Sequence, residues 1–464
     1  MNRHPFLTHT FAITGALTIF AALGWAQRSP DLNPVPFRSA DGKFTGWKLT
    51  IPGNRPLATP AVVDGKIYIG GGFGSHEFYA FDSGSGQHLW TYHTADDGPT
   101  AAVVEGRRII FNTESCEIET LTTDGKPVWK KWLGDPLMSM PAVADGKVYM
   151  AYPNSRSDHR YYLAAFDLAS GSELWHSPIA GEIITAPVVD EEKVYVSTVD
   201  GSLVSFDRKD GKQLWEERKN ATSAPAVWKG QTFFSRREQT NVTVGGRVMA
   251  QQNEVVASKA TTTAAAPVVD VRDTMRAADY LDYKKRAASP TEAKSQSLDA
   301  SVGFAGASKG SANMAASMAN LGQASVHGIW AYQGSKPFVD NGRLYSSMGN
   351  RVMSVDAKTS KVLWTRDLGR DGVNASLTPP AVVNGKVFVG TRTGEVRAMS
   401  EATGEVLWTV NVGEPVVFQP AVMNGRVYVP TESGSIICFE TGDPHDDGWQ
   451  MWGGNGAHNG LKKR

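Results

Sequence analysis

Arginine side chains, together with one histidine, are the groups of this chain whose type and position best fit a binding surface. They lie in segments that interrupt an otherwise regular repeat, and such loops commonly carry function. A guanidinium group binds carboxylates through paired, charge-assisted hydrogen bonds. We therefore expect a surface that binds an acidic region of a partner protein, formed by Arg156, Arg160, Arg236, Arg237 and His76. The alternative is that these residues are ordinary solvated loop charges.

Patterns typical of catalysis are missing from the sequence. It holds no nucleophile elbow, no zinc-ligand spacing and no glycine-rich phosphate loop. The pairs Asp96-Asp97 and Asp446-Asp447 come closest to a cation site, but both lie in polar segments and fit solvated turns. Cys116 and Cys438 lie in different repeats, so we expect both to be unpaired. From these patterns we expect no catalytic residue, no cofactor-binding residue and no metal ligand.

A repeat of about 40 residues must position these groups. Its fullest copies are Thr59–Trp90, Ala186–Trp215 and Pro379–Trp408. Each copy holds four short apolar runs separated by turn residues, and the fourth run contains Leu-Trp. A four-stranded sheet of this size cannot bury both of its faces alone, so it must stack on neighbours. The repeat therefore predicts an all-β fold, a β-propeller of four-stranded antiparallel blades.

Tryptophan marks the fourth strand of each repeat and so counts the blades. We expect each indole ring to pack between blades and to cover a glycine of the next blade. One spacing, between Trp215 and Trp330, is much larger than the others and indicates an insertion. Eight positions predict an eight-bladed propeller: Trp47, Trp90, Trp129, Trp175, Trp215, Trp330, Trp364 and Trp408.

Closure of the ring follows from the unfinished last repeat, which ends near Glu440 without a Leu-Trp strand. Trp47 precedes the first full repeat, so we expect Thr45–Leu49 to pair with Ile436–Phe439. This pairing would remove the open sheet edges that a propeller otherwise leaves. Trp449 is the alternative, but the segment before it, GDPHDDG, is a poor strand sequence.

The chain divides into an N-terminal leader, a linker, the propeller and a tail. Residues 1–26 combine Arg3 and His4, an apolar stretch and small residues, which is typical of a secretory signal; an uncleaved membrane anchor is the alternative. The linker is expected at 27–44, the propeller at 45–448 and a Trp/Gly-rich tail at 449–464. We therefore expect a periplasmic or otherwise exported protein. With 47 basic and 47 acidic side chains, no nucleic-acid partner is indicated.

A low-complexity insertion at 238–327 is expected to interrupt blade five, which would resume near Trp330. Two parts of it are rich in Ala, Ser, Gly and Thr and lack the apolar residues of a packed core. Between these parts, residues 271–289 contain helix formers and an apolar stripe, which predict one short amphipathic helix. The insertion could be a plug over the axial channel, a partner-docking element or an inert segment.

The repeat resembles that of the pyrroloquinoline-quinone-type (PQQ-like) propeller family. The matching residues are an alanine and an aspartate before a glycine turn and a terminal tryptophan, as in Ala80, Asp82, Gly86 and Trp90. The same pattern occurs in Ala165, Asp167, Gly171 and Trp175. The family includes quinone-dependent dehydrogenases, which hold the quinone on the propeller axis with calcium, and non-enzymatic propellers of outer-membrane assembly. The resemblance is closer to the second class, because the adjacent cysteines that clamp the quinone are missing.

The resemblance therefore implies a non-catalytic, exported scaffold that binds other proteins of the cell envelope. On this interpretation no cofactor is expected. The alternative is a PQQ-dependent alcohol or sugar dehydrogenase with a divergent cofactor site, which would bind the quinone with calcium.

Overall fold

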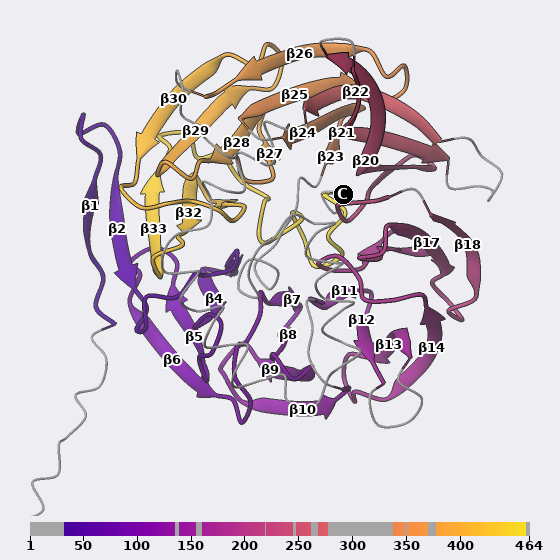
Figure 1. The fold of residues 1–464 in the computed structure, drawn as a ribbon. Coiled ribbons are helices and arrows are strands. Elements are labelled where there is room, and N and C mark those ends of the chain that lie inside the picture. The colour runs from indigo at the N-terminus through magenta and orange to yellow at the C-terminus, as the bar shows by residue number, and fades with distance from the viewer. Residues whose placement is uncertain are drawn as a thin grey trace, which may run out of the picture. The chain divides into compact units, whose positions relative to one another are not determined.

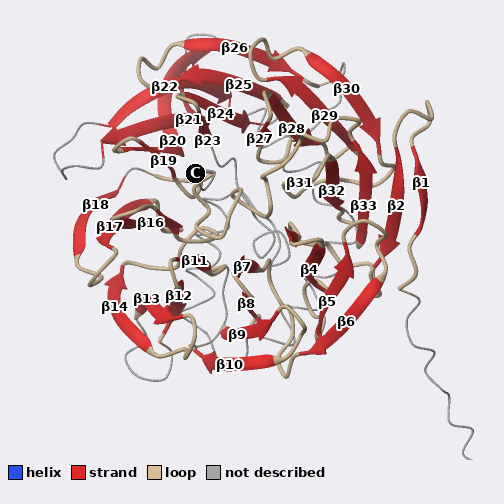
Figure 2. Ribbon diagram, turned by 180° about the vertical axis from the view of Figure 1, so that it is seen from behind, coloured by secondary structure: helices blue, strands red, loops and turns tan. Residues whose placement is uncertain are grey.

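The structure is a computed structural model. It describes residues 32–134, 139–154, 160–218, 220–244, 247–260, 268–276, 337–348, 350–369 and 377–460. The chain forms two units, Met1–Asp31 and Leu32–Arg464, and the first unit, with the expected signal segment, lies outside the described residues. Within those residues the chain forms strands and loops only (Figure 2). None of them forms a helix with the length and apolar character needed to cross a membrane.

Seven sheets contain four antiparallel strands each, with the first strand nearest the centre of a ring and the fourth at its rim (Figure 1). We number them blades one to seven along the chain. Blade one comprises β3 (Ala61–Val63), β4 (Lys66–Gly70), β5 (Glu77–Asp82) and β6 (His88–His93); blade two comprises β7 (Val103–Glu105), β8 (Arg108–Asn112), β9 (Glu117–Thr122) and β10 (Pro127–Trp132); blade three comprises β11 (Ala142–Ala144), β12 (Lys147–Pro153), β13 (Tyr161–Asp167) and β14 (Glu173–Ile179).

The remaining four blades follow the same order. They are blade four, with β15 (Val188–Val189), β16 (Lys193–Ser197), β17 (Ser202–Asp207) and β18 (Gln213–Arg218); blade five, with β19 (Ala226–Trp228), β20 (Gln231–Val244), β21 (Arg247–Ala260) and β22 (Val268–Arg276); blade six, with β23 (Phe338–Asp340), β24 (Arg343–Met348), β25 (Arg351–Asp356) and β26 (Val362–Asp367); and blade seven, with β27 (Ala381–Val383), β28 (Lys386–Gly390), β29 (Glu395–Ser400) and β30 (Val406–Asn411).

One further sheet, the closing sheet, has five strands and joins the two ends of the propeller. Its order is β1 (Val35–Arg38), β2 (Thr45–Thr50), β33 (Ser435–Glu440), β32 (Arg426–Pro430) and β31 (Ala421–Met423). The all-β propeller with antiparallel four-stranded blades is confirmed. The predicted number of eight such blades was wrong, because seven sheets have four strands. The closing sheet differs because part of the expected linker, β1, pairs with β2 along its outer edge.

Closure by Trp47 is confirmed, because β2 pairs with β33 as expected. Trp47 lies opposite Cys438 and Leu49 lies opposite Ile436. Trp449 forms only an isolated bridge with Val422 on the inner strand. The closing sheet therefore takes its outer strands from the N-terminal part of the propeller and its inner strands from the C-terminal part.

Tryptophan rings join neighbouring blades through glycines of the third-to-fourth-strand turns. A Cβ atom at Gly86 would lie 2.7 Å from the Trp47 ring, and one at Gly171 would lie 2.6 Å from the Trp129 ring. The indole N–H groups of Trp47 and Trp129 donate to carbonyl oxygens of the next blade, at 3.1 Å and 2.9 Å. Only glycine leaves room for this ring, and its positive φ also suits the turn. Trp330 lies outside the described residues.

Blade five differs from the expected interrupted repeat. Its second and third strands pair from Gln231↔Ala260 to Val244↔Arg247, and β22 pairs with β21 as the fourth strand. The expectation that the blade resumes near Trp330 was therefore wrong, as was a helix beginning at residue 271. Val268, Val269 and Val271 favour a strand because they are β-branched. The rest of the expected insertion lies outside the described residues.

The tail after β33 crosses the centre of the ring, where it is drawn in yellow in Figure 1. Its backbone carbonyls accept N–H groups of four inner strands: Gln450 from Val62, Trp449 from Val422, Gly456 from Val143 and Ala457 from Val189, at 2.7 to 3.0 Å. The side chain of Trp452 is 1% exposed and packs in a core cluster that includes Ala58, Ala101, Ala186 and Ala224. The tail thus packs as a hydrophobic core at the centre of the ring.

Three aspartates anchor the start of this tail. Lys386 Nζ lies 2.6 Å from Asp443 Oδ2 and 2.7 Å from Asp446 Oδ1, and Asp446 is fully buried. Asp447 Oδ1 accepts the backbone N–H of Asn424 at 3.0 Å. The interpretation of this pair as a solvated turn was therefore wrong for Asp446, which is buried against Lys386 of blade seven, whereas Asp447 is exposed.

Candidate functional site

The two faces of the ring differ in the lengths of their turns. The hairpin face carries the first-to-second and third-to-fourth turns of each blade. Several are two-residue turns with both residues at positive φ, such as Asp64-Gly65, Asp145-Gly146 and Asn384-Gly385. This geometry suits hairpins and leaves little variable surface. The other face, called the loop face, carries the second-to-third turns and the blade-to-blade connections.

A common turn occupies the loop face in four sheets. It begins with threonine, whose hydroxyl accepts a backbone N–H four residues later, as in Thr198, Thr391 and Thr431. It ends in a left-handed residue, which is glycine in three copies: Thr198–Gly201, Thr391–Gly394 and Thr431–Gly434. The fourth copy, Thr113–Cys116, places a cysteine at this position with φ 58°.

A cysteine at this position costs backbone strain that glycine avoids, and it sets this turn apart from the other three copies. A Cβ at Gly201 would lie 2.7 Å from the Asn220 Cα, and one at Gly434 would lie 3.0 Å from the Asn54 Cα. The backbone of the following connection thus packs against the glycines. Cys116 keeps the equivalent backbone bond, from Leu133 N–H to its carbonyl at 3.0 Å. Its side chain is 1% exposed. A left-handed non-glycine residue costs of order 1 kcal/mol, so another interaction must compensate.

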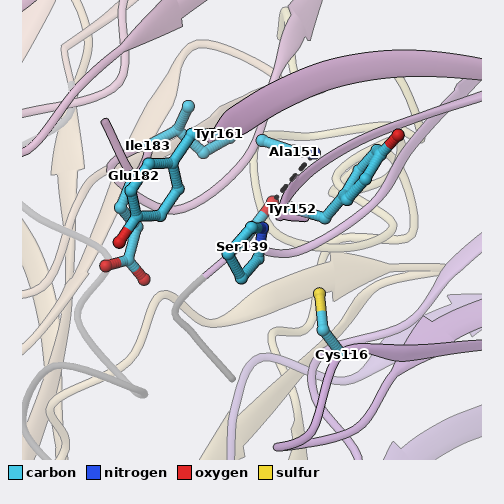
Figure 3. Close-up of a pocket in the computed structure, with 8 residues that line it drawn as sticks. Cys116, Ser139, Ala151, Tyr152, Tyr161, Glu182 and Ile183 are labelled. Atoms are coloured by element: carbon cyan, nitrogen blue, oxygen red, sulfur yellow. Dashed lines mark hydrogen bonds between the residues drawn. The ribbon is translucent and has the colours of Figure 1, made fainter. Parts of the chain in front are cut away.

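A pocket opens beside Cys116 between blades two and three (Figure 3). The space between its lining residues measures about 210 Å³ when open solvent is included, but the enclosed part holds only about one water molecule. Its walls come from β12, from the start of β13 and from the connections that lead to blades three and four. The Ser139 hydroxyl accepts the Ala151 N–H at 3.4 Å, and the Glu182 carboxylate lies beside the Tyr161 ring. The lining residues are Cys116, Ser139, Ala151, Tyr152, Pro153, Tyr161, Glu182 and Ile183.

Carboxylates dominate the electrostatics of this pocket. Burial raises the pKa of the Cys116 thiol, and the charges of Glu182 and Asp96 raise it further. Burial also raises the pKa of the Tyr161 hydroxyl, with a further contribution from Glu182. The thiol is therefore protonated at neutral pH and is not an activated nucleophile.

The sequence-predicted binding residues occupy three sectors of the loop face. His76 is exposed in the turn between β4 and β5. Arg160 is exposed directly before β13, next to the pocket residue Tyr161. Arg236 lies on β20, bridged to Ala221 of the connection into blade five. Arg156 lies outside the described residues, and only the backbone of Arg237 is described.

The pocket residues were not predicted from the sequence. One signal was available, because TESC at 113–116 departs from TVDG, TRTG and TESG in the equivalent turns. Glu182 and Tyr161 carry no local signal, since their proximity depends on how blades three and four stack. Cys116 and Cys438 are unpaired, as expected, and both are buried.

An axial quinone does not fit the described residues. The indole of Trp452 occupies the centre of the ring, and Ala58, Ala101, Ala186 and Ala224 pack around it. His458 stacks edge-on against this ring at 4.7 Å, with its two ring nitrogens 2.7 and 2.9 Å from the carbonyl oxygens of Trp452 and Pro141. Among the described residues no group of three His, Cys, Asp or Glu side chains is placed to hold a metal ion.

Relatives of two classes match the chain. The outer membrane protein assembly factor BamB of Burkholderia pseudomallei is 21% identical over 272 residues, 46% of this chain and 70% of that protein. The quinohemoprotein alcohol dehydrogenase ADH IIB of Pseudomonas putida is 30% identical over 116 residues, 21% of this chain and 16% of that protein. The BamB of Yersinia pestis is matched over 38% of its length. The chain therefore spans less than half the length of the Yersinia protein and of the Pseudomonas dehydrogenase.

Solved structures show the same fold at low sequence identity. BamB from Moraxella catarrhalis gives a TM-score of 0.52 at 14% identity, covering 88% of this chain and 100% of that one. The quinohemoprotein alcohol dehydrogenase from Comamonas testosteroni gives 0.54 at 14% identity, covering 86% and 76%.

The family model described as outer membrane protein assembly factor BamB matches residues 74–161, 114–266, 310–415 and 348–453, more than half of the chain. Together with the propeller fold and its Trp–Gly blade contacts, this match shows that the chain belongs to the PQQ-like propeller family of the outer membrane protein assembly factor BamB.

Proposed function

We propose that this protein is a non-catalytic scaffold of outer-membrane protein assembly and that it binds its partner with the loop face. The observation that carries the proposal is the asymmetry of the two faces. The loop face holds the pocket beside Cys116 and the long β20–β21 pair. The hairpin face holds tight turns, and the tail fills the ring centre. Binding surfaces are commonly built from the irregular loops of a rigid repeat scaffold.

The long pair in blade five supports this assignment. In blade four, Ile184 N–H donates to the carbonyl of Ser197, the last residue of β16. The same bond in blade five joins Thr222 to Ser235, but β20 continues to Val244 and remains paired with β21. The two strands thus extend past the level at which the neighbouring blade turns. A paired extension of this kind offers surface to a partner without loss of the blade.

The proposal includes a partner of the cell envelope with an acidic region for the arginines. Arg160, Arg236 and His76 are the described members of this binding surface. It also includes a periplasmic location, with residues 1–26 as the export signal.

Capture of envelope proteins by the immobilised full-length chain tests the proposal. We expect an outer-membrane assembly protein, identified by mass spectrometry, to bind the original protein. The combined changes Arg160→Glu, Arg236→Glu and His76→Glu should weaken its capture at least about tenfold, equivalent to about 1.4 kcal/mol. The control carries Lys209→Glu, Lys212→Glu and Lys358→Glu, all exposed on the hairpin face. Loss of capture in the control alone would show that the partner binds the hairpin face and would contradict the proposal.

The second candidate function is a quinone-dependent alcohol dehydrogenase, favoured by the matched dehydrogenases. Calorimetric titration with PQQ and calcium, followed by a dye-linked alcohol oxidation assay, separates the two. The proposal predicts neither saturable quinone binding nor oxidation. Tight quinone binding accompanied by alcohol oxidation would replace the scaffold function with the enzymatic one.

A further inference from the structure

We propose that His458 is a pH-dependent clasp: an imidazolium ion that holds the C-terminal tail in the ring centre and releases it when the imidazole loses a proton. The residue lies near the end of the described tail and is 2% exposed. This inference goes beyond the proposed function, because it concerns access to the ring centre rather than recognition on the loop face.

The partners of the imidazole determine its protonation. Its Nδ1 atom lies 2.7 Å from the carbonyl oxygen of Trp452, and its Nε2 atom lies 2.9 Å from the carbonyl oxygen of Pro141. A carbonyl oxygen only accepts hydrogen bonds, whereas a neutral imidazole has one N–H donor and one acceptor nitrogen. A neutral imidazole would therefore direct a lone pair at one of the two oxygens. Both bonds form only when both nitrogens carry a proton.

The surroundings compensate for the burial of this charge. A buried cation costs free energy unless it is hydrogen-bonded, and bonds from an ionised donor are stronger than neutral ones. Both N–H groups of the imidazolium have such a bond. The centroid of the Trp452 indole lies 4.7 Å from that of the imidazole, within the roughly 6 Å at which an aromatic ring attracts a cation.

The inner segments around the imidazolium are uncharged along their length. They contain no Asp, Glu, Lys or Arg: 57–62, 100–104, 139–144, 185–189, 221–226 and 448–460. Beyond these segments, Glu105 and Asp190 accept backbone N–H groups of hairpin-face turns at 2.6 to 2.9 Å, and Asp145 pairs with Arg208. These charges are thus engaged at the hairpin face. The state of the clasp therefore depends on the proton of His458 itself.

The two bonds connect the tail both to itself and to a blade. Trp452 belongs to the tail, whereas Pro141 directly precedes β11 of blade three. His458 has a left-handed backbone with φ 56°, which residues other than glycine adopt uncommonly. A Cβ at Gly453 would lie 2.8 Å from the His458 Cα, so the backbone packs closely here. Such strain persists only where surrounding interactions hold it, and the clasp supplies two of them.

Proton binding is therefore linked to docking of the tail. At neutral pH the docked tail keeps a proton that a free histidine, which titrates at about pH 6.5, has largely lost. Raising the pH above about 6.5 must favour the released tail, and for one proton the populations shift about tenfold per pH unit. Below about pH 6.5 both states are protonated, so this group no longer affects the equilibrium. Release carries Trp452 out of the alanine-lined centre and opens the axis.

Hydrogen exchange of the full-length protein, followed by mass spectrometry, tests the proposal. Val143 and Val189 donate their N–H groups to the tail carbonyls of Gly456 and Ala457, so their exchange reports release of the tail. After correction for the intrinsic pH dependence of exchange, we expect their protection to fall about tenfold per pH unit above about pH 6.5.

Two variants separate the histidines of the tail. His458→Gln should lower the protection of Val143 and Val189 and make it independent of pH. His445→Gln changes the other histidine after β33, which is exposed and contacts Asp443, and should retain the fall. Protection that does not depend on pH in the original protein would overturn the proposal. An unchanged fall in His458→Gln, or loss of the fall in His445→Gln alone, would also overturn it.

NMR of the histidine ring nitrogens in the original protein covers the case in which His458→Gln does not fold. We expect one histidine to keep a proton on both nitrogens at about pH 8, where exposed histidines have lost one. Absence of such a histidine would contradict the clasp. Partner capture is not part of these measurements, so their outcome is independent of the proposed scaffold function.

Discussion

Single residues reveal how the ring tolerates departures from its repeat, and Cys116 is the clearest case. Glycine populates left-handed backbone conformations without a Cβ penalty, whereas alanine does not. We therefore expect Cys116→Gly to be more stable than Cys116→Ala by about 1 kcal/mol, the reverse of the order in a helix or strand. Chemical denaturation of the two variants gives this difference directly. A more stable alanine variant would contradict a left-handed conformation at this position.

Glu414 ties the closing strand β2 to the connection that precedes β31. Burial alone would raise the pKa of this carboxyl, but bonds from Lys48, Thr431 and Ser435 outweigh burial and lower it. A lowered folded-state pKa stabilises the fold above the unfolded value of 4.5, and this contribution is lost as the pH falls through the folded value. We expect Glu414→Gln to cost about 1 kcal/mol at neutral pH, since the bonded group is charged but partly solvated.

The pH profile of unfolding checks this prediction. The difference between the original protein and Glu414→Gln should shrink as the pH falls below about 4. Glu440→Gln is the matched control, because its pair with Arg426 is more exposed, at 58% and 31% of the two side chains. Exposed pairs contribute little, so the control should stay within about 0.5 kcal/mol of the original protein at every pH. A pH-independent loss for Glu414→Gln would assign its effect to packing.

At the scale of the strand, closure depends on β2 more than on β1. Strand β2 is the fourth strand of the closing sheet and carries Trp47. Strand β1 is a fifth strand on the outer edge of this sheet, where the other sheets have none. Deleting the chain through Gly53 should therefore abolish cooperative thermal unfolding, because it exposes the edge of β33. Deleting only through Arg38 should retain a cooperative transition. Equal losses in circular dichroism melts of the two proteins would show that β1 is essential to closure.

The sequence predicted those elements whose signals are local. Because the last repeat lacks a Leu-Trp strand after Glu440, the sequence was enough to place Trp47 in the closing sheet. The glycines of the repeated turns likewise predicted the contacts between neighbouring blades. Blade five was misjudged because β20 and β21 are long and polar, although Gly245-Gly246 between them is a typical hairpin sequence. The fifth strand was missed because Pro36 and the polar flanks of β1 make a weak strand signal.

For the whole molecule, long-range contacts decide what fills the centre and where a site forms. The bond from Val62 to Gln450 joins residues from opposite ends of the propeller, and no local pattern could announce it. The same holds for the pocket, where Cys116 and Glu182 meet through the stacking of blades. The position of the Trp/Gly-rich tail on the axis likewise depends on the complete ring. That position also determines that Trp452, rather than a planar ligand, occupies the centre.

The ring centre should therefore respond to Trp452 as a hydrophobic core does. Trp452 is 1% exposed and lies among residues from blades one to five. Trp452→Ala would leave a cavity that the rigid inner strands cannot fill, so we expect a loss of about 3–5 kcal/mol in the free energy of unfolding. Leu407→Ala is the control, because Leu407 is 50% exposed on the outer strand β30 and should cost less than about 1 kcal/mol. Denaturant titration of both variants tests the assignment. Similar costs would mean that the tail covers the ring without belonging to its core, and the axis would again be open to a ligand.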